Sequence, residues 1–220
     1  MNSKTGHQIK QRNTANDVFI TPKALSKKAI EIAQEGVGGM GGINIWYDPF
    51  RNSGSYYNQF PEPDKYENKW SEILDGRDFF KFTENNWGDM YNGFQGESSC
   101  RIICSNPPYS ILDDVIKHTI AIKPDVVNYL IGINNLTPRR IEMFEKAGYI
   151  QTNFHLCKVF KWYGMSCIVQ FERDSHDIPC LTYDRIVWRE DEMPENDPNL
   201  EEALTQEALA YFENEDSYVD

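Results

Sequence analysis

The organisation of this chain is clearest at residues 101–109, which read Arg101-Ile102-Ile103-Cys104-Ser105-Asn106-Pro107-Pro108-Tyr109. The first half of the stretch is an apolar run that predicts a buried β-strand. The second half predicts a rigid turn, because two successive prolines fix the backbone and cannot donate hydrogen bonds. The carbonyl oxygens of such a turn can act as acceptors. We therefore expect a strand that ends in a rigid loop whose carbonyl oxygens can accept hydrogen bonds.

Strands and helices alternate on both sides of this stretch. Upstream, we expect a helix that starts at Thr21-Pro22, a strand at residues 43–47 and a short strand at residues 70–73. Downstream, the apolar spacing predicts helices at residues 111–122 and 138–147, with strands at residues 126–131, 154–160 and 167–171. Residues 182–188 either add an edge strand or pack along the surface. Alternation of this kind favours an open α/β sheet flanked by helices.

Charge divides the chain into a body and two flanks. The formal net charge of the 220 residues is -12, from 34 acidic and 22 basic side chains. Twelve of the acids fall in residues 190–220, which contain no Lys or Arg, so residues 1–189 are neutral. We expect residues 1–15 to form a basic flexible arm, residues 16–189 one folded domain, and residues 190–220 an acidic tail that is mobile or depends on a partner.

The cysteines and the hydropathy give further expectations. Five scattered cysteines lack the paired spacing of a zinc site or a disulfide framework, so we expect free thiols and no metal. His155 and Cys157, two potential ligands on one strand, are expected to be structural. No apolar run reaches membrane-spanning length, and the first 14 residues lack a signal-peptide core. The sequence therefore predicts a soluble, cytoplasmic protein.

The loop after residue 104 has the composition needed to hold a planar amine. The Asn106 side-chain oxygen and the Pro107 carbonyl could accept both amine protons, which localises the nitrogen lone pair and aims it at an electrophile. Tyr109 would stack on the attached ring. A lone Asn-Pro-Pro-Tyr sequence is also compatible with a plain turn after a strand. The rest of the chain has to separate these two interpretations.

Three other positions suit a nucleoside at the same edge of the sheet. The turn from Asp48 to Gly54 follows the first predicted strand, where ligands bind α/β sheets. Glu72 closes the second predicted strand and suits a ribose diol. Asp78 and Phe79 could offer an acceptor for adenine and a ring edge beside it. Taken singly, each acid is more typical of a solvated surface and each ring of a core, so the order of the segments carries the interpretation.

Together these segments resemble a known family. The ordered series Thr21-Pro22, Asp48-Pro49-Phe50 with Gly54, Glu72, Asp78-Phe79-Phe80 and Asn106-Pro107-Pro108-Tyr109 is similar to the adenine-N6 DNA methyltransferases that use S-adenosylmethionine, in particular compact phage and bacterial members. The resemblance spans roughly residues 16–172. It implies a Rossmann-like methyltransferase fold with a mostly parallel sheet, an antiparallel strand near the C-terminal end, and no large separate target-recognition domain.

The resemblance also implies roles for individual residues. Cofactor-binding residues would be Phe19, Thr21, Pro22, Asp48, Pro49, Phe50, Gly54, Glu72, Asp78 and Phe79. The catalytic loop would be Asn106, Pro107, Pro108 and Tyr109, and Trp162 or Tyr163 would give a second aromatic contact to an extruded adenine. Asn52 stands where family members usually carry glycine. The reaction implied is methyl transfer to the exocyclic N6 amine of adenine in DNA.

Recognition of DNA has to come from elsewhere, since residues 110–172 are used by the catalytic fold itself. Our candidate loops are residues 84–99 and residues 134–140, where the guanidinium groups of Arg139 and Arg140 could meet phosphates. The basic arm, a second subunit or a homodimer could also supply recognition. Surface charge at a helix start is an equally good interpretation of the two arginines. The same loop also occurs in methyltransferases of RNA and of protein glutamine. A non-catalytic subunit that keeps the fold to bind DNA or a partner is a further alternative.

Overall fold

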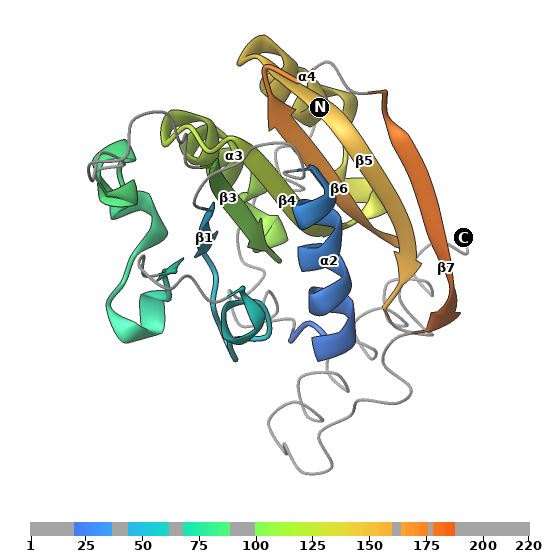
Figure 1. Cartoon of the computed structure of the whole chain (residues 1–220), viewed down its shortest axis with the longest axis horizontal. Coiled ribbons are helices and arrows are strands. Elements are labelled where there is room, and N and C mark those ends of the chain that lie inside the picture. The colour runs from blue at the N-terminus through green and yellow to red at the C-terminus, as the bar shows by residue number, and fades with distance from the viewer. Residues whose placement is uncertain are drawn as a thin grey trace, which may run out of the picture.

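The structure is a computed structural model that describes residues 20–36, 44–61, 68–88, 100–159, 164–175 and 178–187. These residues form a seven-stranded sheet with the strand order β2-β1-β3-β4-β6-β5-β7 (Figure 1). The strands are β1 (Asn44–Asp48), β2 (Lys69–Trp70), β3 (Cys100–Ser105), β4 (Val126–Gly132), β5 (Tyr149–Lys158), β6 (Ser166–Arg173) and β7 (Cys180–Val187).

The sheet is mostly parallel. Strands β2, β1, β3 and β4 pair in parallel, as do β5 and β7. Strand β6 lies antiparallel between β4 and β5. The expected fold class, an open α/β sheet with an antiparallel strand near its C-terminal end, is confirmed. Because the carboxyl ends of β1, β2 and β3 meet at one edge, the loops that follow them are neighbours.

Helix α2 (Lys23–Gly36) covers one face of the sheet, and α3 (Leu112–Ala121) and α4 (Pro138–Lys146) cover the other (Figure 1). Strand β3 shows why both faces are apolar: Ile102 and Cys104 belong to the core under α2, whereas Ile103 belongs to the core under α3. Successive residues of a strand point to opposite faces, so a strand buried on both sides reads as a continuous apolar run.

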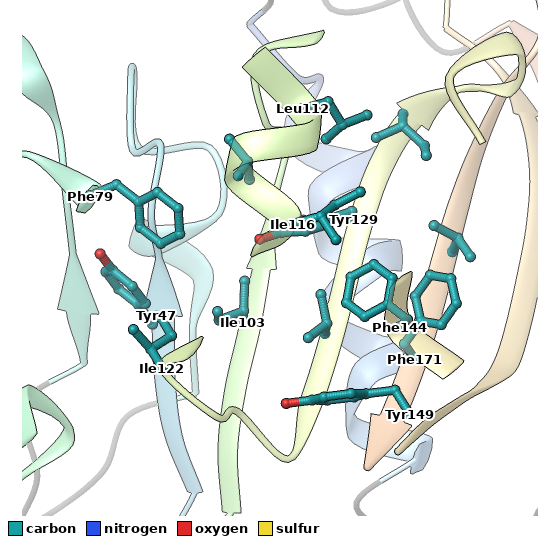
Figure 2. Close-up of a cluster of buried hydrophobic side chains, with 14 of the residues drawn as sticks. Tyr47, Phe79, Ile103, Leu112, Ile116, Ile122, Tyr129, Phe144, Tyr149 and Phe171 are labelled. Atoms are coloured by element: carbon teal, nitrogen blue, oxygen red, sulfur yellow. The ribbon is translucent and has the colours of Figure 1, made fainter. Parts of the chain in front are cut away.

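Aromatic rings fill much of the core beneath α3 and α4. The rings of Phe144 and Phe171 stack with centroids 4.1 Å apart, and Tyr149 lies edge-on to Phe144 (Figure 2). Leu112, in the first turn of α3, is fully buried in the same cluster. Burying a side chain of this size contributes about 1.5–3 kcal/mol. This packing fixes the start of α3, and with it the loop that leads from β3.

Two local expectations were wrong. The strand expected at residues 70–73 ends at Trp70, because the Glu72 carboxylate accepts from the Leu74 N–H and starts a 3₁₀ turn instead. The loop expected from residue 84 begins as a 3₁₀ helix, Glu84–Trp87. Trp87 is 1% exposed and donates from Nε1 to the Ile122 carbonyl at 2.8 Å, so this part is anchored to the core. Residues 89–99 lie outside the described part.

The remaining boundaries extend the predictions. Strand β7 confirms the edge strand expected near residues 182–188, and β5 begins five residues earlier than expected. Among the described residues, no helix combines the length and apolar character needed to cross a membrane. Residues 1–15 and 190–220, the expected arm and tail, are outside the described ranges.

Candidate active site

The turn after β1 and the loop after β3 are joined by one buried hydrogen bond. Ser105 Oγ, at the end of β3, donates to Asp48 Oδ1, at the end of β1, at 2.6 Å. Neither side chain is exposed to solvent. The two segments expected to hold a cofactor and an amine are therefore in direct contact. Sequence reasoning assigned no role to Ser105, although a small hydroxyl residue beside Asn106 at a strand end was a usable signal.

Asp48 is a buried acid that lacks a cationic partner among the described residues. Burial raises the pKa of its carboxyl group from 3.8 to about 7. Hydrogen bonds from the Ser105 hydroxyl and from the backbone N–H groups of Phe50 and Tyr57 lower the pKa of Asp48, but by less than burial raises it. No ion pair to Asp48 is formed within the described ranges. A cationic ligand at this position would be attracted to the ionised form of the carboxyl group and would stabilise that form.

Glu72 binds the backbone of the same turn. Its Oε2 accepts from the Asn52 N–H at 2.8 Å, and its Oε1 accepts from the Leu74 N–H at 3.3 Å. Asn52 has a left-handed backbone with φ 43°, a conformation that Asn tolerates better than most residues. Asn at a position usually held by glycine is thus accommodated. Each carboxylate oxygen can accept a further hydrogen bond, which suits a ribose diol.

Gly54 is required by the turn that follows. Its φ is +81°, and a Cβ atom here would lie 2.6 Å from the Asn58 side chain. The Gly54 carbonyl accepts from the Asn58 N–H at 3.0 Å, which closes the turn. The next residue, Ser55, accepts at its carbonyl from Ser26 Oγ at 2.8 Å. The turn after β1 is therefore fastened to the first turn of α2.

The residues just before α2 also reach the Asn106–Tyr109 loop. Asn106 Nδ2 donates to Thr21 Oγ1 at 3.3 Å, which orients the Asn106 amide. Thr21 is 5% exposed, and the Pro22 carbonyl accepts from the Ser26 N–H at 3.0 Å. Thr21 thus links two segments that are 85 residues apart.

The rest of the Asn-Pro-Pro-Tyr loop is partly buried. Pro107 is buried, whereas Pro108 is half-buried and extended with φ -65° and ψ 129°. Tyr109 starts a single 3₁₀ turn, Tyr109–Ile111, and packs against the core under α3. The loop is therefore supported from below and partly open above.

Asp78 and Phe79 lie next to the turn after β1, where Phe79 contacts Phe50. Asp78 Oδ1 accepts from the Phe80 N–H at 3.0 Å and caps a short 3₁₀ helix. Phe79 is 3% exposed and packs against Phe50 in a T-shaped arrangement, with the ring centroids 5.1 Å apart. Pro49, between Asp48 and Phe50, is buried. Phe80, which received no separate role, is more exposed than Phe79.

The two arginines of α4 differ in their surroundings. Arg140 is largely buried, donates from Nε to Asp113 Oδ1 at 2.7 Å, and donates from Nη1 to the Asn135 carbonyl at 2.7 Å. The Arg140 hydrogen bond lowers the pKa of the Asp113 carboxyl group. Arg139 lies 3.6 Å from Asp113 Oδ2, and its side chain is 73% exposed. Arg140 thus joins α4 to α3, and Arg139 remains the candidate for a phosphate contact.

Three expected site residues, Phe19, Trp162 and Tyr163, lie outside the described ranges. Within those ranges, no three His, Cys, Asp or Glu side chains are grouped so that they could hold a metal ion. His155, buried on β5, contacts Thr182 at 2.7 Å and Asp184 at 2.9 Å, both on β7. It therefore holds the edge strand in place.

No protein-family model and no curated protein matches this sequence. Among solved structures, the chain is similar to a protein from Agrobacterium tumefaciens described as a predicted O-methyltransferase, with 12% identity over 84% of this chain and 95% of that one and a TM-score of 0.40. It is also similar to a putative hemolysin from Lactococcus lactis, with 12% identity over 83% and 97% of the two chains and a TM-score of 0.38.

A third similar structure is a protein-(glutamine-N5) methyltransferase from Alicyclobacillus acidocaldarius, with 14% identity over 72% of this chain and 100% of that one. Its TM-score is 0.34. Identities and scores of this size do not indicate a shared substrate or a shared activity.

Proposed function

We propose that this protein transfers a methyl group from S-adenosylmethionine to the N6 amine of adenine in DNA, with the adenine flipped out of the helix. The observation that carries the proposal is the Ser105–Asp48 hydrogen bond. It joins the loop whose sequence suits a planar amine to a turn whose buried acid suits a cation. A methyl transfer of this kind needs both parts, because the amine accepts the methyl group and the positively charged sulfonium donates it.

S-adenosylmethionine fits the residues at this edge. When bound, it supplies a methyl group activated by a positively charged sulfur. Asp48 offers a buried carboxylate that has no cationic partner in the described part of the chain. Glu72 and Asp78 follow along the same edge, and each keeps acceptor capacity beyond its backbone hydrogen bond. Glu72 would hold the ribose, and Asp78 with the edge of Phe79 would hold the adenine.

The chain's own residues act on the amine. The side-chain oxygen of Asn106 and the carbonyl of Pro107 would accept the two amine protons, which localises the lone pair on nitrogen and stabilises the positive charge that develops there. Thr21 keeps the Asn106 amide in one orientation. Tyr109 would stack on the base, and the stiffness of Pro107-Pro108 holds the acceptors in place before the reaction.

Adenine must leave the duplex to reach this loop, because its amine is inaccessible inside the helix. Trp162 or Tyr163 would give a second ring contact to the flipped base. Arg139, exposed at the start of α4, would contact a phosphate. A second subunit or a second copy of the chain would add sequence recognition, since the described domain uses its helices and strands for its own fold.

Transfer to RNA or to protein glutamine is the competing activity, because each substrate also presents an amine on a planar carbon. Thr21-Pro22 and the Asp48-Pro49 turn favour DNA through the resemblance of the sequence. A non-catalytic, DNA-binding subunit is the alternative of a different class. The intact Asn106–Tyr109 loop disfavours it.

Radiolabelled S-adenosylmethionine offered with DNA, RNA and protein pools separates these possibilities. We expect label in DNA, with N6-methyladenine as the product. The Asn106→Ala variant, which removes the amine contact, should leave the DNA unlabelled. Label in RNA or protein instead would assign the substrate to that class, and DNA binding without transfer by the wild-type protein would favour the subunit.

A further inference from the structure

Two partly exposed isoleucines lie in the turns that follow β3 and β4, at the same edge of the sheet as the Asn106–Tyr109 loop. Ile111 closes the 3₁₀ turn after β3, and Ile133 opens the 3₁₀ turn after β4, Ile133–Asn135. Each side chain is 38% exposed. Strands β3 and β4 are parallel neighbours, with Ser105 opposite Tyr129, so both turns lie at the carboxyl edge of the sheet.

The two turns are joined on their buried side by residues that line one cavity. Leu112, next to Ile111, lines the same small apolar cavity as Asn135 and Leu136. Figure 2 shows Leu112 in the first turn of α3, beside β4. Ile133 is also held from its other side, because its N–H donates to the Met165 carbonyl at 2.9 Å. The isoleucines are therefore presented by rigid backbone rather than by free loop ends.

The charged side chains that follow Ile111 on α3, and those they contact on α4, carry a small excess of positive charge. Asp113 lies between two guanidinium groups, at 2.7 Å from Arg140 and 3.6 Å from Arg139, and can balance only one of them. The neighbouring acid, Asp114, is paired with Lys117 at 2.8 Å. These five side chains together leave one positive charge, and Arg139 is the more exposed of the two arginines.

We propose that Ile111 and Ile133 form an apolar wedge that enters duplex DNA beside the flipped adenine, with Arg139 on the adjacent phosphate. The inference rests on the proposed function and extends it by naming double-stranded DNA as the substrate. Isoleucine side chains inserted at a base step unstack it and fill the space that the extruded base leaves. A rigid wedge next to the amine-holding loop would stabilise the open duplex in the state that places the base in the loop.

Isolated exposed isoleucines are common, so position is the deciding feature. Ile150 shows the contrast. It is 39% exposed, close to the value for Ile111 and Ile133, but it lies at the amino end of β5 and therefore at the opposite edge of the sheet. It provides a matched control, because truncating it removes the same side chain from a similarly exposed site.

The test compares methyl transfer to native and heat-denatured genomic DNA, using the whole protein and labelled S-adenosylmethionine. A wedge is needed only where a base must be extruded, so Ile133→Ala and Ile111→Ala should each lower the rate on native DNA by roughly tenfold or more. The rate on denatured DNA should change by less than about twofold, because the unpaired base needs no extrusion. Ile133→Leu should restore most of the rate on native DNA, and Ile150→Ala should change neither rate.

Failure of the wedge and failure of the proposed function give different results. An equal loss on both DNA forms, or no loss on either, would overturn the wedge while transfer to DNA itself stands. A wild-type protein that labels only denatured DNA would also overturn it. A wild-type protein that labels neither DNA form would remove the proposed function and the wedge with it.

Discussion

Replacing Asp48 by asparagine should stabilise the folded protein at neutral and alkaline pH. Burial raises the pKa of Asp48 from 3.8 to about 7, so the folded state holds a proton that the unfolded chain has already released between those two values. Stability therefore falls as the pH rises through this window and levels off above pH 7. At about 1.4 kcal/mol per pH unit, the full loss is about 4 kcal/mol. The Asp48→Asn variant has no charge to bury and keeps an oxygen for the Ser105 hydroxyl.

Guanidinium unfolding of the two proteins at several pH values measures this effect. The variant should be the more stable protein, and its advantage should grow by about 2–3 kcal/mol between pH 5 and pH 8. Asp114→Asn, at an exposed acid, controls for the loss of one negative surface charge. Stability curves that run parallel for Asp48→Asn and wild type would refute the reasoning, because they would mean that Asp48 does not titrate in this range.

Three other outcomes follow from the site. Asn106→Ala should lower turnover by about 100-fold or more and leave S-adenosylmethionine affinity within about twofold, because in the proposed reaction the amide would contact the reacting amine. Steady-state kinetics and calorimetry measure the two quantities, and equal losses would contradict that role. Calorimetry should also show S-adenosylmethionine binding the wild-type protein about tenfold more weakly at pH 6 than at pH 8, since Asp48 must lose its proton to meet a cation; a pH-independent affinity would oppose this assignment. Arg140→Ala should lower the free energy of unfolding by about 1–3 kcal/mol, because Asp113 and the Asn135 carbonyl lose the Arg140 donor. Arg139→Ala should lower it by under about 0.5 kcal/mol and should reduce the slope of log binding constant against log salt concentration for DNA by about one, the value for one phosphate contact. Identical effects of the two variants would contradict the different roles assigned to the two arginines.

The elements that the sequence predicts well are those defined by neighbouring residues. Strand β3 follows from a short apolar run, and its end follows from two prolines. Helix α4 begins where Thr137 accepts from the Arg140 N–H and Pro138 takes the first helical position, a start that the residues themselves signal. Each of these features depends on chemistry within a few positions of the chain.

Features that depend on distant partners were harder to predict. The Ser105–Asp48 hydrogen bond spans 57 residues and requires the pairing of β1 with β3 to be known. The Arg140–Asp113 contact spans 27 residues and needs the packing of α4 against α3. Glu72 illustrates competition between two local structures. The residue could continue strand β2, or its side chain could cap the 3₁₀ helix that follows, and the structure shows the cap. Contacts between distant residues can be predicted only once the order and register of the strands are known.

The Ser105–Asp48 contact has a consequence for protein engineering. A designer who grafts the Ser105–Tyr109 segment of this chain onto another scaffold would also have to transplant an aspartate at the end of the adjacent strand, in matching register. Natural variation should obey the same constraint, so that loss of the hydroxyl and loss of the acid tend to occur together. Under the proposed function, specificity for the methyl donor and specificity for the methyl acceptor would then change as a pair rather than one at a time.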